Sequence, residues 1–277
     1  MSWSRFRYIC RKALSECNEN ESIKACLERI ESEPEGSLYG EPVKLSSLAG
    51  RLLNGVINIE DEDQARKAVL IYKNLRLDDV QVQMSRFRRV FAYLVVVIAV
   101  FYLVLGIYRT KIIPTFLESY EVFEASAPEF ILSFLSYSAN LSALLIMLLL
   151  LVLFVFIVIN KLFKFERYTE DGMVFKYLLS AKIKQPYRNL IEIIQFPVEL
   201  NSSGGVLGSH LGNVYSGKMD LLTEMQELIN LEMVKLVAAC NLQLKAIATV
   251  MGVVITVCVF FLLYSVYMPL FAAGEMV

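Results

Sequence analysis

The sequence predicts an all-α fold, namely a polytopic membrane protein with three transmembrane helices and two small cytoplasmic helical-bundle domains. The first observation is composition, because 56% of the 277 residues are apolar, whereas soluble globular chains usually hold about 45 to 50%. The second is that the apolar excess is concentrated in three runs without a charged residue: Val90 to Tyr108, Phe130 to Asn160 and Ala246 to Gly274.

Each apolar run is long enough to cross a membrane as a helix. A spanning helix needs roughly 20 apolar residues to cross about 30 Å of hydrocarbon. The alternative is a helix buried in a soluble core, but such helices usually keep a polar face and rarely stay apolar beyond about 14 residues. We therefore expect transmembrane helices over 90–109, 138–160 and 246–268.

The three spans define the organisation of the chain. In chain order we expect cytoplasmic helical domain 1 over 1–89, a transmembrane helix over 90–109, a short outer loop over 110–137, a second transmembrane helix over 138–160, cytoplasmic helical domain 2 over 161–245, a third transmembrane helix over 246–268 and an outer tail over 269–277.

Charge predicts the orientation of these spans. The amino-terminal stretch is charged and lacks the apolar core of a signal peptide, so we expect it to stay in the cytoplasm. Lys and Arg are frequent before the first apolar run and after the second, whereas the loop between them holds Arg109, Lys111 and several glutamates. Positive residues favour the cytoplasmic side. This predicts a multi-pass membrane protein with a cytoplasmic amino terminus and a carboxyl terminus on the outer side.

In the first cytoplasmic domain, the stretch 32–42, SEPEGSLYGEP, reads as a turn or linker between two helical parts. The stretch 60–76 after it reads as a helix, because Ala65, Ala68 and Tyr72 recur at spacings of three and four residues. Acidic residues stand at the start of this stretch and basic residues at its end, which is the arrangement that the helix dipole favours.

In the second cytoplasmic domain we expect helical stretches near 169–183 and 187–195, followed by a Gly/Ser-rich loop over 201–217. From 218 to 240 an apolar stripe of Leu222, Met225, Ile229, Met233 and Leu236 again predicts a helix. No helix-breaking residue separates this helix from the third apolar run, so we expect it to continue into the membrane.

Catalytic and metal-binding patterns are weak in this sequence. The stretch 212–219, GNVYSGKM, has Met219 where a phosphate-binding loop needs Ser or Thr, and it reads as a flexible linker. His210 is the only histidine and reads as a solvated loop residue. Cys10, Cys17 and Cys26 are spaced too widely for a Cys-x-x-Cys site. We expect no enzyme activity, no cofactor and no metal, and the net charge of -1 gives no basic footprint for nucleic acid.

A Pro-x-Phe motif follows the first and the last apolar run. Pro114 and Phe116 align with Pro269 and Phe271 at an offset of 155 residues, and Gly274 follows the second motif. An amphipathic helix precedes each run, so the chain reads as an internal repeat. Because proline interrupts helical hydrogen bonding, we interpret both motifs as helix-ending signals where the chain leaves the bilayer on its outer face.

With these motifs, IIPTF at 112–116 and YMPLFAAG at 267–274, the sequence resembles the inner-membrane platform proteins of type IV pilus and type II secretion machines, the type II secretion protein F family. The resemblance covers roughly 65–160 and 215–277, as a short and divergent member. It implies two related cytoplasmic helical domains, three membrane helices, and Pro114, Phe116, Pro269, Phe271 and Gly274 as family-motif positions at the outer membrane interface.

The resemblance also implies a function without catalysis. A platform protein couples a cytoplasmic assembly ATPase to the assembly of pilins or pseudopilins, beside other inner-membrane assembly proteins and membrane lipid, and we expect a homo-oligomer. A small transporter or channel subunit is the alternative, although the apolar runs lack the ionisable residues that transport requires. A membrane-anchored adaptor is the other alternative.

Overall fold

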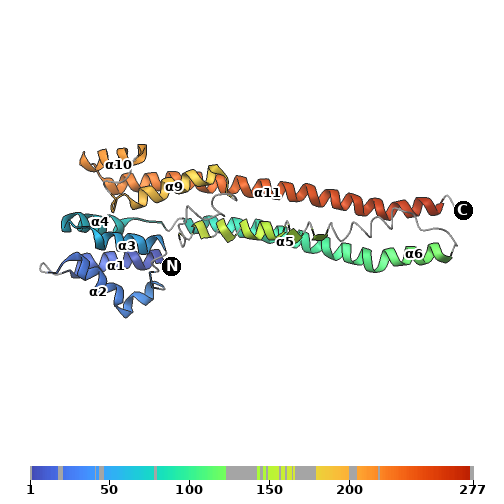
Figure 1. Cartoon of the computed structure of the whole chain (residues 1–277), viewed down its shortest axis with the longest axis horizontal. Coiled ribbons are helices and arrows are strands. Elements are labelled where there is room, and N and C mark those ends of the chain that lie inside the picture. Colours follow the sequence, from blue (N-terminus) through green and yellow to red (C-terminus); the bar gives the residue numbers. More distant parts are fainter. Residues whose placement is uncertain are drawn as a thin grey trace. The chain divides into compact units, whose positions relative to one another are not determined.

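The computed structural model of the chain describes residues 2–17, 21–40, 42–43, 47–77, 80–122, 142–143, 146–147, 149–155, 157–159, 161–163, 165, 179–199, 205–217 and 219–274. Every element in these residues is helical, and none of them forms a strand, which confirms the expected all-α class. In chain order the elements are α1 (Ser2–Glu16), α2 (Ile23–Ser32), η1 (Pro34–Tyr39), α3 (Leu48–Asn58), α4 (Glu62–Asn74), α5 (Val80–Ile107), η2 (Tyr108–Ile112), α6 (Ile113–Val122), α9 (Ala181–Gln195), α10 (Val206–Ser216) and α11 (Leu221–Gly274) (Figure 1).

The chain divides into two compact units. Unit 1 comprises Met1–Met84 and Val158–Cys240, and unit 2 comprises Ser85–Ile157 and Asn241–Val277. Unit 1 therefore combines residues from both of the segments that the sequence assigns to the cytoplasm. Unit 2 combines residues from the apolar runs.

In unit 1, α1 packs against α2, α3 and α4. The core of this bundle is apolar, and the rings of Phe6 in α1 and Tyr72 in α4 meet edge to face with centroids 5.3 Å apart. Three helices begin with a polar cap, because the side chains of Ser22, Ser47 and Asp61 accept hydrogen bonds from backbone N–H groups of α2, α3 and α4. Such caps satisfy N–H groups that have no partner within the helix.

The helix expected over 60–76 is confirmed as α4, which covers Glu62–Asn74. The predicted apolar face is the buried one, since Ala65, Ala68 and Tyr72 have almost no exposed surface. The segment expected as a turn or linker over 32–42 contains the short helix η1. Its Tyr39 stacks on Tyr8 of α1 with ring centroids 4.3 Å apart, so this connection is packed against the bundle.

The prediction of a Gly/Ser-rich loop over 201–217 is wrong for most of that stretch. Residues 206–216 form the helix α10, which contains His210 and most of the stretch that the sequence suggested was a flexible linker. Each glycine costs a helix about 1 kcal/mol relative to alanine, but α10 buries Leu211 and Val214 completely or nearly so. Burial of two such side chains contributes a few kcal/mol, about 1.5 to 3 each, and outweighs that cost.

Helices α3 and α10 of unit 1 have matching residues at three buried positions. Both have 11 residues, and at an offset of 158 positions Gly50 corresponds to Gly208, Leu53 to Leu211 and Val56 to Val214. All six residues are buried. The same residue types thus occupy the packed face of the same helix in each half of the chain, which supports the repeat expected from the Pro-x-Phe motifs.

Hydrogen bonds join the two halves of unit 1. The hydroxyl of Tyr72 donates to the carbonyl oxygen of Ile194, near the end of α9, at 2.8 Å. The side chain of Gln226 in α11 pairs twice with the backbone of Arg76, accepting from its N–H and donating to its carbonyl oxygen, both at 3.0 Å. The helical stretch expected at 187–195 is confirmed within α9, whereas most of the stretch expected at 169–183 lies outside the described residues.

In unit 2, α5 and α11 pack side by side and run in the same direction (Figure 1). Ile98 of α5 shares one buried cluster with Met251 of α11, and further along both helices Phe101 and Leu105 share a second cluster with Cys258. The residue numbers rise together from one cluster to the next, as they must for parallel helices. The helix expected from 218 onward is confirmed to continue without interruption through the third apolar run.

Two helices in the described residues are long and apolar enough to cross a membrane, rather than the three expected. They cover Val95–Val122 and Leu221–Phe261. The expected span over 138–160 lies partly outside the described residues, and its described part includes the apolar helix Leu149–Phe163.

The interpretation of the two prolines as helix-ending signals is wrong. After α5 the chain passes through one wide π turn, η2, in which the Ile113 N–H bonds to the carbonyl oxygen of Tyr108, and α6 then continues to Val122. Pro114 lies in the first turn of α6, where a missing N–H costs little. Pro269 lies within α11. A single proline there removes one backbone bond, and apolar surroundings favour keeping the others.

Candidate functional site

The family-motif positions lie on two helices of unit 2. Pro114 and Phe116 are in α6, where the proline is exposed and the phenylalanine is half-buried. Pro269, Phe271 and Gly274 are in the last turns of α11, and Phe271 is 70% exposed. The structure therefore places Pro114 and Phe271 on helical surface, where a partner or a lipid headgroup layer can contact them.

Helix α5, which precedes α6, and helix α11 each carry a line of exposed apolar side chains. The α5 stripe consists of Tyr93, Val96, Val100, Leu103 and Ile107, and the α11 stripe consists of Val250, Val253, Val257, Phe260, Tyr264, Tyr267 and Phe271. Spacings of three and four residues alternate along both stripes, so each stripe follows one face of its helix. Ile98, Phe101 and Leu105 face the packed side of α5 instead.

The two stripes have the same spacing. Tyr93 corresponds to Val250, Val100 to Val257 and Ile107 to Tyr264, in each case at an offset of 157 positions. The α11 stripe ends on the motif residue Phe271. Apolar surface this extensive is not left in contact with water in stable proteins. The stripes therefore require a cover of hydrocarbon or of other apolar helices.

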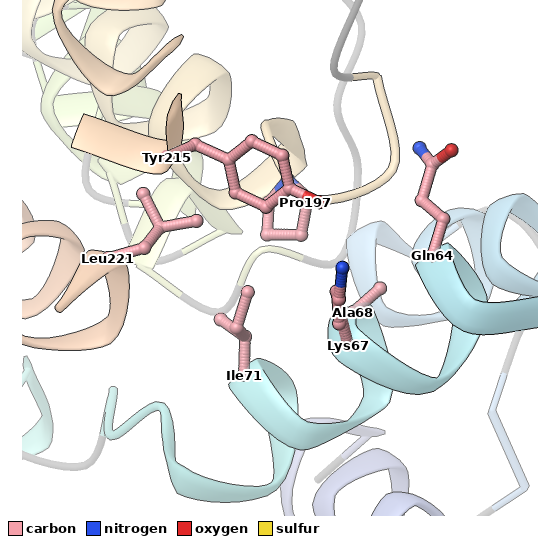
Figure 2. A pocket seen from close by; sticks show the side chains of 7 residues that line it. All are labelled: Gln64, Lys67, Ala68, Ile71, Pro197, Tyr215 and Leu221. Carbon is pink, nitrogen blue, oxygen red and sulfur yellow. The ribbon is translucent and has the colours of Figure 1, made fainter. Parts of the chain in front are cut away.

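Unit 1 has a shallow hollow between α4, α10 and the start of α11 (Figure 2). Its cavity volume is about 10 Å³, about the room that one water molecule needs and far below the roughly 300 to 1,000 Å³ of typical small-molecule sites. The polar groups at its edge are Gln64, Lys67 and the hydroxyl of Tyr215, and the Lys67 ammonium lies 6.0 Å from the centre of the Tyr215 ring. None of the described residues that line it carries a carboxylate, an imidazole or a thiol.

His210 lies on α10, and its Nε2 is 2.8 Å from a carboxylate oxygen of Glu224 in α11. Both side chains are accessible to solvent. The interpretation of His210 as a loop residue is wrong because residues 206–216 are helical. Its position on the exposed side of α10, in hydrogen-bond contact with an acidic side chain, is that of a surface residue, and exposed polar contacts of this kind contribute at most about 1 kcal/mol to stability.

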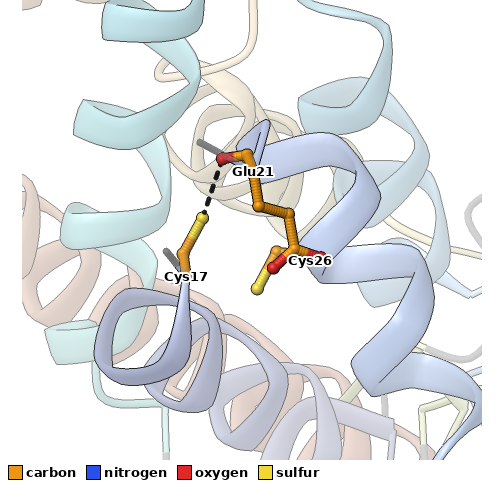
Figure 3. A group of neighbouring side chains, drawn as sticks. All are labelled: Cys17, Glu21 and Cys26. Atoms are coloured by element: carbon orange, nitrogen blue, oxygen red, sulfur yellow. Dashed lines mark hydrogen bonds between the residues drawn. The ribbon is translucent and has the colours of Figure 1, made fainter. Parts of the chain in front are cut away.

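Three of the four cysteines of unit 1 lie in its first two helices or between them, in two different surroundings, and the fourth, Cys240, is buried in α11. Cys10 is buried in the bundle, and burial raises the pKa of its thiol well above the usual value, so it is a packing residue. Cys17 and Cys26 come together with Glu21 where α1 ends and α2 begins (Figure 3). Sequence reasoning missed this group because it tested only Cys-x-x-Cys spacing. The signal that finds it is a cysteine on each side of a short connection between two packed helices.

No family model, curated protein or solved structure matches the chain.

Proposed function

We propose that this protein is the inner-membrane platform of a type IV pilus or type II secretion machine and acts without catalysis. The observation that carries the proposal is the doubled arrangement of an exposed apolar helix followed by Pro-x-Phe. Pro114 and Phe116 follow the α5 stripe, and Pro269 and Phe271 lie at the end of the α11 stripe. This doubled arrangement is what the resemblance to platform proteins implies.

The proposed topology has three membrane helices, with 138–160 as the second crossing beside α5 and α11. Two crossings alone would return the carboxyl terminus to the side where the chain began. The third crossing keeps both Pro-x-Phe motifs on the same, outer face, as the Lys and Arg distribution predicts. Unit 1 then lies in the cytoplasm, where it is available to an assembly ATPase.

In this proposal, coupling runs along α5 and α11. Both helices have residues in unit 1 and in unit 2. A helix that stays intact passes a rotation or displacement of one end to the other end. Contact of the ATPase with unit 1 would thereby move the outer ends of these helices, where the motifs contact pilin or pseudopilin subunits.

Co-purification and deletion test the proposal. The detergent-solubilised protein is expected to co-purify with an assembly ATPase and with pilins or pseudopilins, and deletion of its gene is expected to abolish piliation or secretion. Normal piliation and secretion in the deletion strain, with neither partner recovered, would contradict the proposal.

A matched pair of variants separates the motif from general apolar contact with lipid. Phe271→Ala changes the motif, and Phe260→Ala changes an equally exposed phenylalanine of the same stripe. We expect Phe271→Ala to reduce assembly in the complemented strain at normal protein level, and Phe260→Ala to leave it near the wild-type level. An equal loss of assembly in both variants would indicate that Phe271 acts only through contact of the α11 stripe with lipid, and it would contradict a separate role for the motif.

A further inference from the structure

Cys17, Glu21 and Cys26 form a compact group of potential metal ligands in unit 1. The two sulfur atoms and a carboxylate oxygen of Glu21 all lie within 4.8 Å of one another. Cys17 follows the last turn of α1, and Cys26 is in the first turns of α2 (Figure 3). Packing of α1 against α2 therefore holds the three ligands from two elements rather than from one loop.

The thiol groups of Cys17 and Cys26 each lie near a backbone carbonyl oxygen. Cys17 donates to the backbone carbonyl oxygen of Glu21 at 3.2 Å, and Cys26 lies 3.8 Å from the carbonyl oxygen of Ala13. Hydrogen bonds from sulfur are weak, so these contacts do not prevent the two side chains from rotating toward a cation. Cys26 is buried whereas Cys17 and Glu21 are half-exposed, so one side of the group is open to solvent.

A positive charge already occupies the region around these ligands. The Arg29 guanidinium lies 3.3 Å from Glu21 and 3.6 Å from the Cys26 sulfur. It also contacts Glu33 at 3.2 Å and Glu16 at 3.9 Å. Arg29 can therefore keep an ion pair with Glu33 when Glu21 turns toward a cation. Lys12 also contacts Glu16, Glu33 and Glu35, so four carboxylates face two cations in this region, and the negative balance favours a divalent cation.

We propose that Cys17, Glu21 and Cys26 bind a thiophilic divalent cation of the zinc class, with water as the fourth ligand. Two thiolates and one carboxylate are among the ligands that zinc prefers, at about 2.0 to 2.3 Å. Ligand atoms of one tetrahedral ion then lie about 3.3 to 3.8 Å apart, which small side-chain rotations reach from the present positions. Each thiol releases its proton to solvent as its sulfur binds the cation. The site does not depend on the proposed platform role.

Cobalt(II) is the probe, because its bonds to thiolate absorb light and those of zinc do not. The purified full-length protein, in detergent and fully reduced, is titrated with Co²⁺. We expect thiolate-to-cobalt absorption that saturates at one equivalent and disappears when Zn²⁺ is added.

Four variants locate the site. Cys17→Ser and Cys26→Ser are expected to abolish the absorption. Glu21→Gln is expected to weaken binding by about tenfold or more, since even the loss of a partner outside the ligands costs 10- to 100-fold. The control Cys258→Ala removes a buried cysteine of unit 2 and is expected to bind like the wild type. Since Cys17 is half-exposed, its substitution keeps the test valid if Cys26→Ser fails to fold.

Two results would overturn the proposal. One is the absence of thiolate-to-cobalt absorption, or its persistence in Cys17→Ser. The other is loss of both thiols in the protein isolated without reductant, with the mass lower by two hydrogen atoms and no metal bound. That second result would identify a disulfide between Cys17 and Cys26 in place of a metal site.

Discussion

Tyr72 shows how a single side chain joins the two halves of unit 1. Its ring is buried against Phe6, and its hydroxyl reaches the carbonyl oxygen of Ile194 near the end of α9. The last carbonyl groups of a helix have no partner within the helix. The tyrosine therefore satisfies a group that would otherwise be buried without a hydrogen bond, and this single bond connects residues 122 positions apart.

Tyr72→Phe is expected to destabilise unit 1 by about 1 to 3 kcal/mol, the range for leaving a buried acceptor unpaired. Urea unfolding followed by the fluorescence of Trp3 measures the loss, because this only tryptophan packs on Phe6 in the bundle. Tyr8→Phe is the control, since the Tyr8 hydroxyl bonds to Glu35 at 3.3 Å in an exposed position. Equal stability of Tyr72→Phe and the wild type would contradict the bond.

Two helical glycines differ in the space around them. A Cβ atom at Gly55 in α3 would lie 2.5 Å from a methyl carbon of Val198, whereas a Cβ atom at Gly212 in α10 would meet nothing within 4 Å. Gly55→Ala is expected to cost about 1 to 3 kcal/mol through overpacking. Gly212→Ala is expected to gain about 0.5 to 1 kcal/mol, because glycine is unfavourable within a helix.

The same unfolding measurement, followed by Trp3 fluorescence, checks both glycine variants. Stabilisation by Gly212→Ala would support the helix α10 directly, since a flexible linker at this position predicts no gain. Destabilisation by both substitutions would contradict the packing described for α10.

Lys12 links α1 to the segment that contains η1. Its ammonium lies 2.6 Å from both Glu33 and Glu35, and these bonds raise the pKa of Lys12 above its usual value. The bond from Lys12 also lowers the pKa of Glu35 below the usual 4.5. The contribution of Glu35 to stability is thus present above pH 4.5 and is lost as the pH falls through its lowered pKa.

Lys12→Met is therefore expected to destabilise unit 1 at pH 7, and its difference from the wild type is expected to shrink as the pH falls below about 4.5. Unfolding at several pH values between 3 and 8 measures this difference. Lys182→Met changes an exposed lysine of α9 and is expected to show no such pH dependence. A constant difference for Lys12→Met at all pH values would contradict the assigned charge effect.

At the scale of elements, α4 was predictable from sequence and α10 was not. In α4 the apolar spacing, the acidic start and the basic end all favour the same helix. In α10 the residues Gly208 and Gly212 indicate a loop by local preference, and only the burial of Leu211 and Val214 in the folded protein favours a helix. Local preference is weak, and packing overrides it.

The element α5 continues into α6 for a related reason. Sequence reasoning treated Pro114 as a stop, because proline lacks the N–H of a regular helical turn. The π turn η2 changes the hydrogen-bond register just before Pro114, so the chain resumes a helix with the proline in its first turn. A wide turn of this kind depends on the bonding of the surrounding backbone, which residue spacing alone does not indicate.

At the scale of the whole chain, sequence predicted helices over the first and third apolar runs but not which segments pack together. The pairing of Tyr72 with Ile194 and the grouping of Cys17, Glu21 and Cys26 depend on how helices meet. No periodic pattern in one sequence carries that information. The family-motif residues were found from sequence because they recur at a fixed offset.

The parallel packing of α5 and α11 in unit 2 is testable with a native cysteine. Leu105→Cys places a second thiol in the buried cluster that contains Cys258. Mild oxidation is expected to join residues 105 and 258, and mass spectrometry of the linked peptide identifies the bond. Leu103→Cys is the control, because Leu103 is 63% exposed whereas Leu105 is 5% exposed. Equal linkage from both positions would contradict the packing.

The matching stripes of α5 and α11 have a consequence for how this protein can evolve. In a symmetric dimer of identical chains, any substitution appears on both copies of a surface at once. Here the two copies are separate stretches of one chain, so Val100 can change while Val257 stays the same. Every molecule therefore carries one α5 stripe and one α11 stripe. Substitutions in one stripe can adapt it to a particular neighbouring helix or protein without changing the other stripe.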